Sequence, residues 1–151
     1  TYKNCNTLET MIGCSPRGFV TYVSPSYGGS CSDRQIIEAS NLLEKSQFCQ
    51  GDSIMADRGG IMVQDLFAAH DVTVNTPTTM RGKNQLPAEV VVKDRRIASK
   101  RVHVERIIGL AKTYKILQNE INHSFTPKGG RIIFVCFVLS NFRTSIVGKY
   151  C

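Results

Sequence analysis

A short apolar segment that ends in an acidic residue places the firmest constraint on the fold of this chain. Residues 53–56 lie between Gly51-Asp52 and Asp57-Arg58-Gly59-Gly60. The segment is too short for a helix and turn residues bound it on both sides, so we predict a buried strand. Asp57 then lies at the carboxyl end of this strand, where open α/β sheets bind ligands. The alternative is an ordinary turn at Asp57 with no chemical role.

A second acidic residue lies in a long basic segment downstream. Residues 88–118 lack proline and contain one internal glycine, Gly109, so they can form a long helix. Glu105 lies about 100° around this helix from Val104, at the edge of the predicted apolar stripe. The alternative is an exposed glutamate paired with Arg101, although a cation at i−4 is the less favourable order. The stripe comprises Val90, Ile97, Val104, Ile108 and Ala111.

Length and charge narrow the class of protein. The 151 residues suffice for one domain that buries a core without disulfides or metal ions. Charged residues make up 21% and hydrophobic residues 42%, which argues against overall disorder. Lys and Arg number 19 against 12 Asp and Glu, a net charge of +7. A basic domain suits a polyanionic partner, with nucleic acid ahead of a membrane surface, although a generic basic domain remains an alternative.

The cysteines and the hydropathy pattern bear on the environment of the chain. No two cysteines have the two-to-four-residue spacing of a zinc site, so we expect reduced thiols in an intracellular protein, with a disulfide framework as the alternative. No apolar run approaches the ~20 residues of a spanning helix, so no membrane contact is expected. The six cysteines are Cys5, Cys14, Cys31, Cys49, Cys136 and Cys151.

The remaining sequence predicts strands first and helices later. Two β-rich runs, 7–13 and 19–23, are joined by turn residues typical of a hairpin. Ser32 or Asp33 offers an N-cap for a helix over 34–44. This order describes a mixed sheet with helices. The other expected elements are a loop at 24–30, a helix at 61–69, a strand at 72–74, loops at 76–87 and 122–130, and a core helix at 132–142.

Two acids on such a sheet suggest metal chemistry. Carboxylate oxygens are hard ligands that hold Mg²⁺ or Mn²⁺ and leave positions for water and phosphate oxygens. Two such ions about 3.5–4 Å apart stabilise the attacking and leaving oxygens of a phosphoryl transfer. Basic side chains would neutralise the nucleic-acid backbone. Arg81 and Lys83, in the 76–87 loop, are candidates for that contact, with a solvated linker as the alternative.

Several spaced motifs together resemble the DDE superfamily endonuclease domain of Harbinger-type and related transposases, over nearly the whole chain. The resemblance implies an α/β fold with an RNase H-like mixed sheet flanked by helices, divalent-metal-dependent DNA cleavage and strand transfer, and a nuclear location. The motifs are Tyr2-Lys3 with Asn6-Thr7, Ile12-Gly13 with Ser15-Pro16, Tyr27-Gly28-Gly29-Ser30 with Ser32-Asp33, Met55-Ala56-Asp57-Arg58-Gly59, Arg81-Gly82-Lys83, Arg95-Arg96-Ile97-Ala98-Ser99, and Arg101-Val102-His103-Val104-Glu105-Arg106.

The resemblance also assigns roles to single residues. In the family's triad of two aspartates and one glutamate, Asp57 matches the second aspartate and Glu105 the glutamate, so both are expected as catalytic metal ligands. Asp33 is interpreted first as a helix cap and second as a metal neighbour. His103 is expected on the surface or facing DNA, because it lies about 200° around the helix from Glu105. Residues expected to contact DNA are Arg81, Lys83, Arg101 and Arg106.

The sequence departs from the family pattern in three ways. The first aspartate of the triad is expected on a strand upstream of Thr1, so residues 1–151 are expected to form a single domain that is incomplete at its N-terminus and lacks its first strand. Gly60 stands where relatives usually carry a large aromatic residue, which should loosen packing beside the site. No segment is typical of a helix-turn-helix, so DNA recognition is expected from a homo-oligomer or a separate DNA-binding subunit.

Two other functions remain open. A catalytically inactive DNA- or protein-binding remnant of a transposase would keep the fold without assembling the metal site. The unmatched first aspartate favours this remnant, whereas the motifs around Asp57 and Glu105 favour the enzyme. A basic structural domain with no nucleic-acid role is the third reading.

Overall fold

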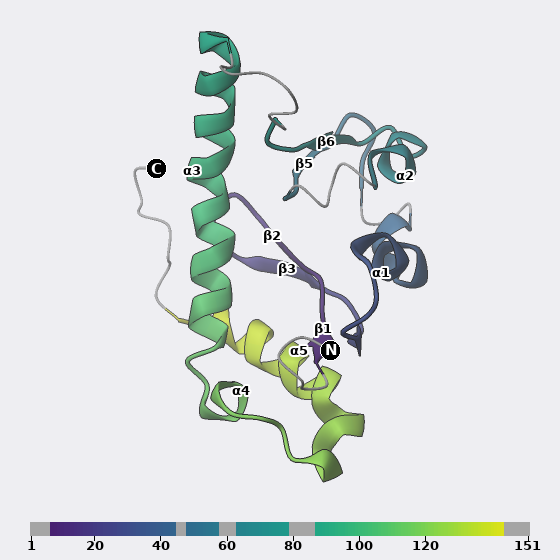
Figure 1. Cartoon of the computed structure of the whole chain (residues 1–151), viewed down its shortest axis with the longest axis vertical. Coiled ribbons are helices and arrows are strands. Elements are labelled where there is room, and N and C mark those ends of the chain that lie inside the picture. Colours follow the sequence, from purple (N-terminus) through teal and green to yellow (C-terminus); the bar gives the residue numbers. More distant parts are fainter. Residues whose placement is uncertain (1–6, 45–47, 58–62, 79–86, 144–151) are drawn as a thin grey trace. The chain divides into compact units, whose positions relative to one another are not determined.

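The computed structural model describes residues 7–44, 48–57, 63–78 and 87–143 (Figure 1). The chain divides into two compact units, each with its own buried residues. Unit 1 comprises Thr1–Ile36 and His103–Cys151, and unit 2 comprises Ile37–Val102. The two units are described in turn.

Unit 1 begins with two antiparallel strand pairs. Strand β2 (Ile12–Cys14) pairs with β3 (Val20–Val23), and the register shifts between Gly13 and Cys14. Gly18 has a φ of 82°, which suits glycine in the turn that joins these strands. The predicted hairpin is therefore confirmed. Strand β1 (Leu8–Glu9) pairs instead with β4 (Tyr27–Gly28), so the predicted loop at 24–30 contains one short strand.

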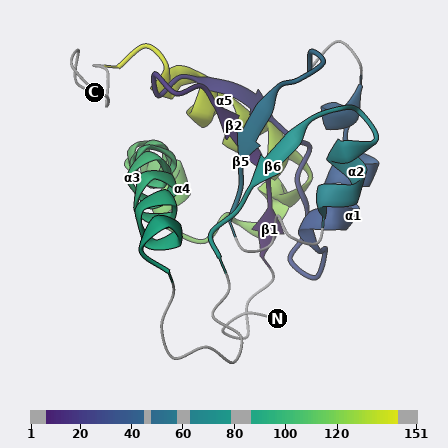
Figure 2. The ribbon, with the colours of Figure 1, turned by 90° about the horizontal axis from the view of Figure 1, so that it is seen from above.

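The core of unit 1 lies between the β2–β3 hairpin and two helices. Ile107 and Ala111 of helix α3 (Ala88–Ala111) and Phe137 of helix α5 (Gly129–Ser140) form its buried cluster. Helix α5 packs against β3 (Figure 2). Asn141, just after α5, accepts from the backbone N–H of Val20 at 2.8 Å and donates to its carbonyl at 2.9 Å. One side-chain amide thus ties the end of α5 to the β3 strand.

The predicted long helix over 88–118 is interrupted. Helix α3 ends at Ala111, and a short helix α4 (Lys115–Gln118) follows an extended residue, Tyr114. The Thr113 hydroxyl donates to the carbonyl of Leu110 at 2.7 Å, a local bond that competes with helix continuation. Arg143 then donates to Thr113 Oγ1 and lies over the Tyr114 ring. The helix is thus interrupted where a distant part of the chain makes contacts. Helix propensity does not include such contacts.

The predicted loop at 122–130 is also largely helical. A 3₁₀ helix, η4 (His123–Lys128), leads directly into α5, which begins at Gly129. A Cβ atom at Gly129 would lie 2.6 Å from Cδ1 of Leu8, and one at Gly130 would lie 3.1 Å from Oγ of Ser26. The two glycines therefore permit a close approach of α5 to the strand segments, and do not mark a loop.

Unit 2 contains a parallel strand pair and the helix that connects the two strands. Strand β5 (Ser53–Met55) pairs with β6 (Thr73–Asn75), and helix α2 (Gln64–Ala68) lies between them in sequence (Figure 2). Both predicted strands are confirmed to within one residue. The predicted helix over 61–69 is confirmed at 64–68, while residues 61–62 lie outside the described part. The prediction of a buried strand is wrong, because Met55 in this two-stranded sheet is 47% exposed.

The interior of unit 2 is small. Val63, Phe67 and Val72 are buried, and the ring of Phe48 meets Phe67 edge-on at a centroid distance of 5.6 Å. Ile97 is the buried residue of the α3 part of this unit. Phe67 is only 1% exposed, so much of the apolar stabilisation of unit 2 depends on it.

Helix α1 (Asp33–Ala39) has the predicted N-cap but ends early. The Ser32 hydroxyl accepts from the Gln35 N–H, and Gln35 Oε1 accepts from the Ser32 N–H at 2.9 Å, which is a capping box. Ser40 Oγ donates to the Ile37 carbonyl and accepts from the Leu42 N–H. These bonds divert the backbone into a 3₁₀ turn, η2 (Asn41–Leu43), so the predicted helix over 34–44 is too long.

The described strands support the predicted α/β class but not the predicted single mixed sheet. The described strands form three two-stranded sheets, two antiparallel and one parallel. The mixed α/β class is confirmed, whereas a single mixed sheet is not formed by the described strands. No helix in the described part of the chain is long and apolar enough to cross a membrane.

The four described cysteines are free thiols that differ in environment. Burial raises the pKa of the Cys14 and Cys136 thiols, whereas Cys49 is exposed. A raised pKa leaves less thiolate at pH 8, so we expect a thiol reagent to modify Cys49 well before Cys136. Labelling followed by mass spectrometry measures the order. Equal rates at the two sites would contradict the burial of Cys136 in the core of unit 1.

Candidate metal and nucleic-acid site

Asp57 lies at the carboxyl edge of the parallel pair in unit 2. The Ala56 N–H donates to the carbonyl of Asn75 at 3.0 Å, so pairing continues just beyond β5. Asp57 follows directly, with a side chain that is 65% exposed. The predicted placement of Asp57 at the end of a strand is therefore confirmed, and it leaves the carboxylate accessible. Such an edge is where α/β sheets bind ligands.

Arg101 of α3 contacts this carboxylate. Its Nη2 donates to Asp57 Oδ2 at 3.1 Å, and the Arg101 side chain is 32% exposed. An ion pair this accessible contributes only about 0–1 kcal/mol to stability. Its main consequence is positional, because it sets a residue of α3 against the end of β5.

A second contact brings the chain that leaves β6 to the same helix face. The N–H of Thr78 donates to both carboxylate oxygens of Asp94, at 3.2 and 3.3 Å, and its hydroxyl donates to Oδ1 at 3.1 Å. Asp94 and Arg101 are seven positions apart, two turns of α3, and so share a face. The segments that follow both parallel strands thus meet one face of α3. The sequence signal that we missed was Asp94, an acid within a basic run.

Glu105 lies on α3 four residues after Arg101, and its side chain is exposed. Residues at this spacing lie one helical turn apart on the same face. Glu105 belongs to unit 1 and Asp57 to unit 2. That the two carboxylates converge on one metal ion stays a prediction.

The predicted DNA contacts are described only in part. Arg106 is exposed on α3, Arg101 is bound to Asp57, and Arg81 and Lys83 lie outside the described residues. Cations surround the first part of α3, as the sequence indicated. The exposed ones are Lys93, Arg95, Arg96 and Lys100.

The structure bears differently on the predictions for Asp33 and His103. Asp33 is exposed in the first turn of α1, where an acidic side chain favours the helix dipole, and its role as a metal neighbour stays a prediction. His103 is half-buried, and its predicted role of facing DNA stays a prediction. Its Nδ1 is buried and has no hydrogen-bond partner among the described residues. The predicted apolar stripe is confirmed at Ile97 and Ala111, which are buried. It omitted the buried Ile107, which follows His103 by one turn.

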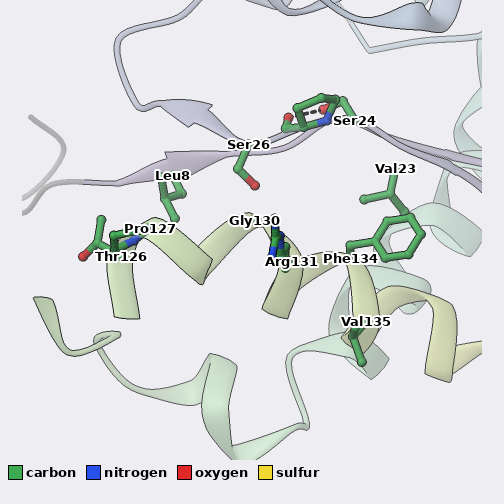
Figure 3. A pocket seen from close by; sticks show the side chains of 11 residues that line it. Leu8, Val23, Ser24, Ser26, Thr126, Pro127, Gly130, Arg131, Phe134 and Val135 are labelled. Carbon is green, nitrogen blue, oxygen red and sulfur yellow. Dashed lines mark hydrogen bonds between the residues drawn. The ribbon is translucent and has the colours of Figure 1, made fainter. Parts of the chain in front are cut away.

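One cavity in unit 1 is lined by none of the predicted site residues. It measures about 640 Å³ and lies between the segment after β3 and helix α5 (Figure 3). Val23 and Ser26 lie on one side, and Phe134 and Val135 of α5 on the other. Its lining contains no acidic side chain, so it offers no ligand of the kind that the carboxylate chemistry requires.

The donor set fits a hard divalent cation in chemistry. Asp57 and Glu105 are exposed carboxylates, and Mg²⁺ commonly binds through one or two carboxylates together with water and substrate phosphates. Within residues 7–44, 48–57, 63–78 and 87–143, no three His, Cys, Asp or Glu side chains gather into a metal-binding group. Any further ligands would come from water, from the substrate or from elsewhere.

One of three comparisons with known proteins identifies a family for this chain. The model of the DDE superfamily endonuclease family matches residues 1–141, a range that includes β5 with Asp57 and α3 with Glu105. The searches of curated proteins and of solved structures found no significant match. The family match covers both units over most of their length. The chain therefore belongs to the DDE superfamily endonuclease family.

Proposed function

We propose that this chain is the endonuclease domain of a Harbinger-type or related transposase, with an RNase H-like arrangement, and that it acts in the nucleus. It would cleave DNA phosphodiesters in a reaction that requires Mg²⁺ or Mn²⁺. The family match carries the proposal, because it spans an exposed aspartate at the carboxyl end of a parallel strand and the helix that bears Glu105. Residues 1–151 would form one domain.

Asp57 and Glu105 would hold the metal ion. The family match supports this assignment, because it spans both residues. When bound, the ion would polarise the phosphodiester and lower the pKa of the attacking water. In cleavage, a water oxygen bonds to phosphorus while the bond to the 3′ oxygen breaks, which leaves a 3′ hydroxyl. In strand transfer, the oxygen of that hydroxyl would bond to the phosphorus of a second phosphodiester while the bond from that phosphorus to its own 3′ oxygen breaks, and the proton of the attacking hydroxyl would pass to solvent.

The cations of the chain would bind the DNA backbone. Arg101 and Arg106 lie on α3 before and after Glu105, so they are suited to neutralise phosphates flanking the scissile one. Arg81 and Lys83 would contribute from the segment after β6. Recognition of a particular DNA sequence would come from a second copy of the chain or from a separate DNA-binding subunit.

Nicking of supercoiled plasmid DNA tests the proposed function. We expect conversion to open circles with Mg²⁺ or Mn²⁺ and none with a chelator. We also expect DNA affinity to fall with rising salt, because phosphate contacts release counterions. DNA binding without nicking under all metal conditions would indicate the inactive remnant. No binding at any salt concentration would exclude both.

A further inference from the structure

Two positively charged groups are candidate partners of the Asp57 carboxylate. Arg101 Nη2 donates to its Oδ2 at 3.1 Å, and the proposed function assigns the same carboxylate to a divalent cation. We propose that Arg101 is a positioning residue that competes with the metal ion for Asp57 and leaves the carboxylate when the ion binds. This inference rests on the proposed function and concerns the regulation of that site.

The positive charge of the guanidinium makes Arg101 compete with a cation at Oδ2. Arginine has five N–H donors, no acceptor and a charge that it keeps at any physiological pH, so it cannot act as a metal ligand or yield by losing a proton. A cation that bonds to Oδ2 would lie within a few ångströms of the guanidinium. The two positive groups repel at that separation. Metal binding at Oδ2 therefore favours departure of Arg101 from the carboxylate.

The surroundings allow such a move at low cost. The Asp57 side chain is 65% exposed and that of Arg101 is 32% exposed, so water can solvate both groups when they part. Exposed pairs of this kind are weak, which limits the competition to about twofold to fivefold in metal affinity. The pair would hold Asp57 in place without preventing metal binding.

Release of Arg101 would also supply a phosphate ligand. A guanidinium forms bidentate hydrogen bonds with phosphate, and we expect Arg101 to contact DNA. Metal binding at Asp57 would thus free the side chain that DNA requires. Because coupling between two ligands is reciprocal, DNA would in turn strengthen metal binding.

Mn²⁺ binding, followed through the EPR signal of the free ion, tests the competition. Arg101→Ala is compared with Arg95→Ala, which removes the same charge from an exposed position on a different face of α3. We expect Arg101→Ala to bind Mn²⁺ about twofold to fivefold more tightly than Arg95→Ala does. Arg101→Lys keeps the positive charge and should restore the affinity of the unaltered chain.

A measurement on the unaltered chain avoids any effect of substitution on folding. Phenylglyoxal modifies accessible arginines, and mass spectrometry identifies the modified residues. We expect Mn²⁺ to raise the modification rate of Arg101 and to leave that of Arg95 unchanged.

The outcomes separate the inference from the proposed function. Mn²⁺ affinity of Arg101→Ala equal to or below that of Arg95→Ala would overturn the competition, and so would an Arg101 modification rate that Mn²⁺ does not raise. If Asp57→Asn still lost Mn²⁺ binding in that case, the proposed metal site would stand. No Mn²⁺ binding by any of these proteins would overturn the proposed site and the inference with it.

Discussion

Asp57→Asn is expected to reduce metal-dependent DNA nicking by about 100-fold to 1,000-fold. The substitution keeps the size of the side chain but removes its negative charge, and the amide nitrogen is a donor that cannot bind a cation. Because Asp57 is exposed at the end of β5, little else should change. The measurement is the initial rate of plasmid nicking at saturating Mg²⁺, together with the thermal unfolding midpoint.

Glu89→Gln is the matched control for this prediction. Glu89 is an exposed acid in the first turn of α3, so its substitution removes one charge from the same unit without affecting the proposed ligands. We expect it to nick DNA at the rate of the unaltered chain. Asp57→Asn activity equal to that of the control would assign Asp57 to an ordinary turn.

Phe67→Ala is expected to lower the free energy of unfolding of unit 2 by about 3–5 kcal/mol. The side chain is 1% exposed and meets Phe48 edge-on, so truncation removes buried apolar area and leaves a cavity. A loss of this size is a large fraction of the stability of a small domain. Urea unfolding followed by circular dichroism measures the change.

Phe142→Ala removes the same aromatic side chain from an exposed position and serves as the control. Phe142 is 82% exposed, so we expect its substitution to alter stability by less than about 0.5 kcal/mol. Similar losses in the two variants would show that Phe67 does not lie in a packed interior.

Helices and strands were predictable from the sequence where turn or capping residues mark their ends. Turn residues on both sides of β5 located that strand and placed Asp57 at its end. The N-cap candidate Ser32 likewise located the start of α1, and in the structure it forms a capping box with Gln35. These signals are local, so the sequence contains them in full.

Tertiary contacts decided the features that the sequence analysis got wrong. The Gly129-Gly130 pair predicted a loop, but the close approach of Leu8 and Ser26 makes glycine suitable within a helix. Helix propensity predicted no break near Thr113, where Arg143 makes its contacts. In both cases the deciding partner is far away in the sequence.

The candidate site was predictable in its residues and only partly in their contacts. Helix spacing suggested Glu105 as a partner of Arg101. The structure shows an ion pair of Arg101 with Asp57, which helix spacing does not suggest. Helical periodicity locates neighbours on one helix. It cannot locate a strand end that the fold brings to that helix.

The central claim is that Asp57 and Glu105 bind the same metal ion, and calorimetric titration with Mn²⁺ tests it most directly. The chain is compared with Asp57→Asn, Glu105→Gln and the double variant. We expect each single substitution to weaken Mn²⁺ binding at least about tenfold, and the double variant to lose less than the sum, because ligands of one ion are coupled. Wild-type affinity in either single variant would contradict the claim.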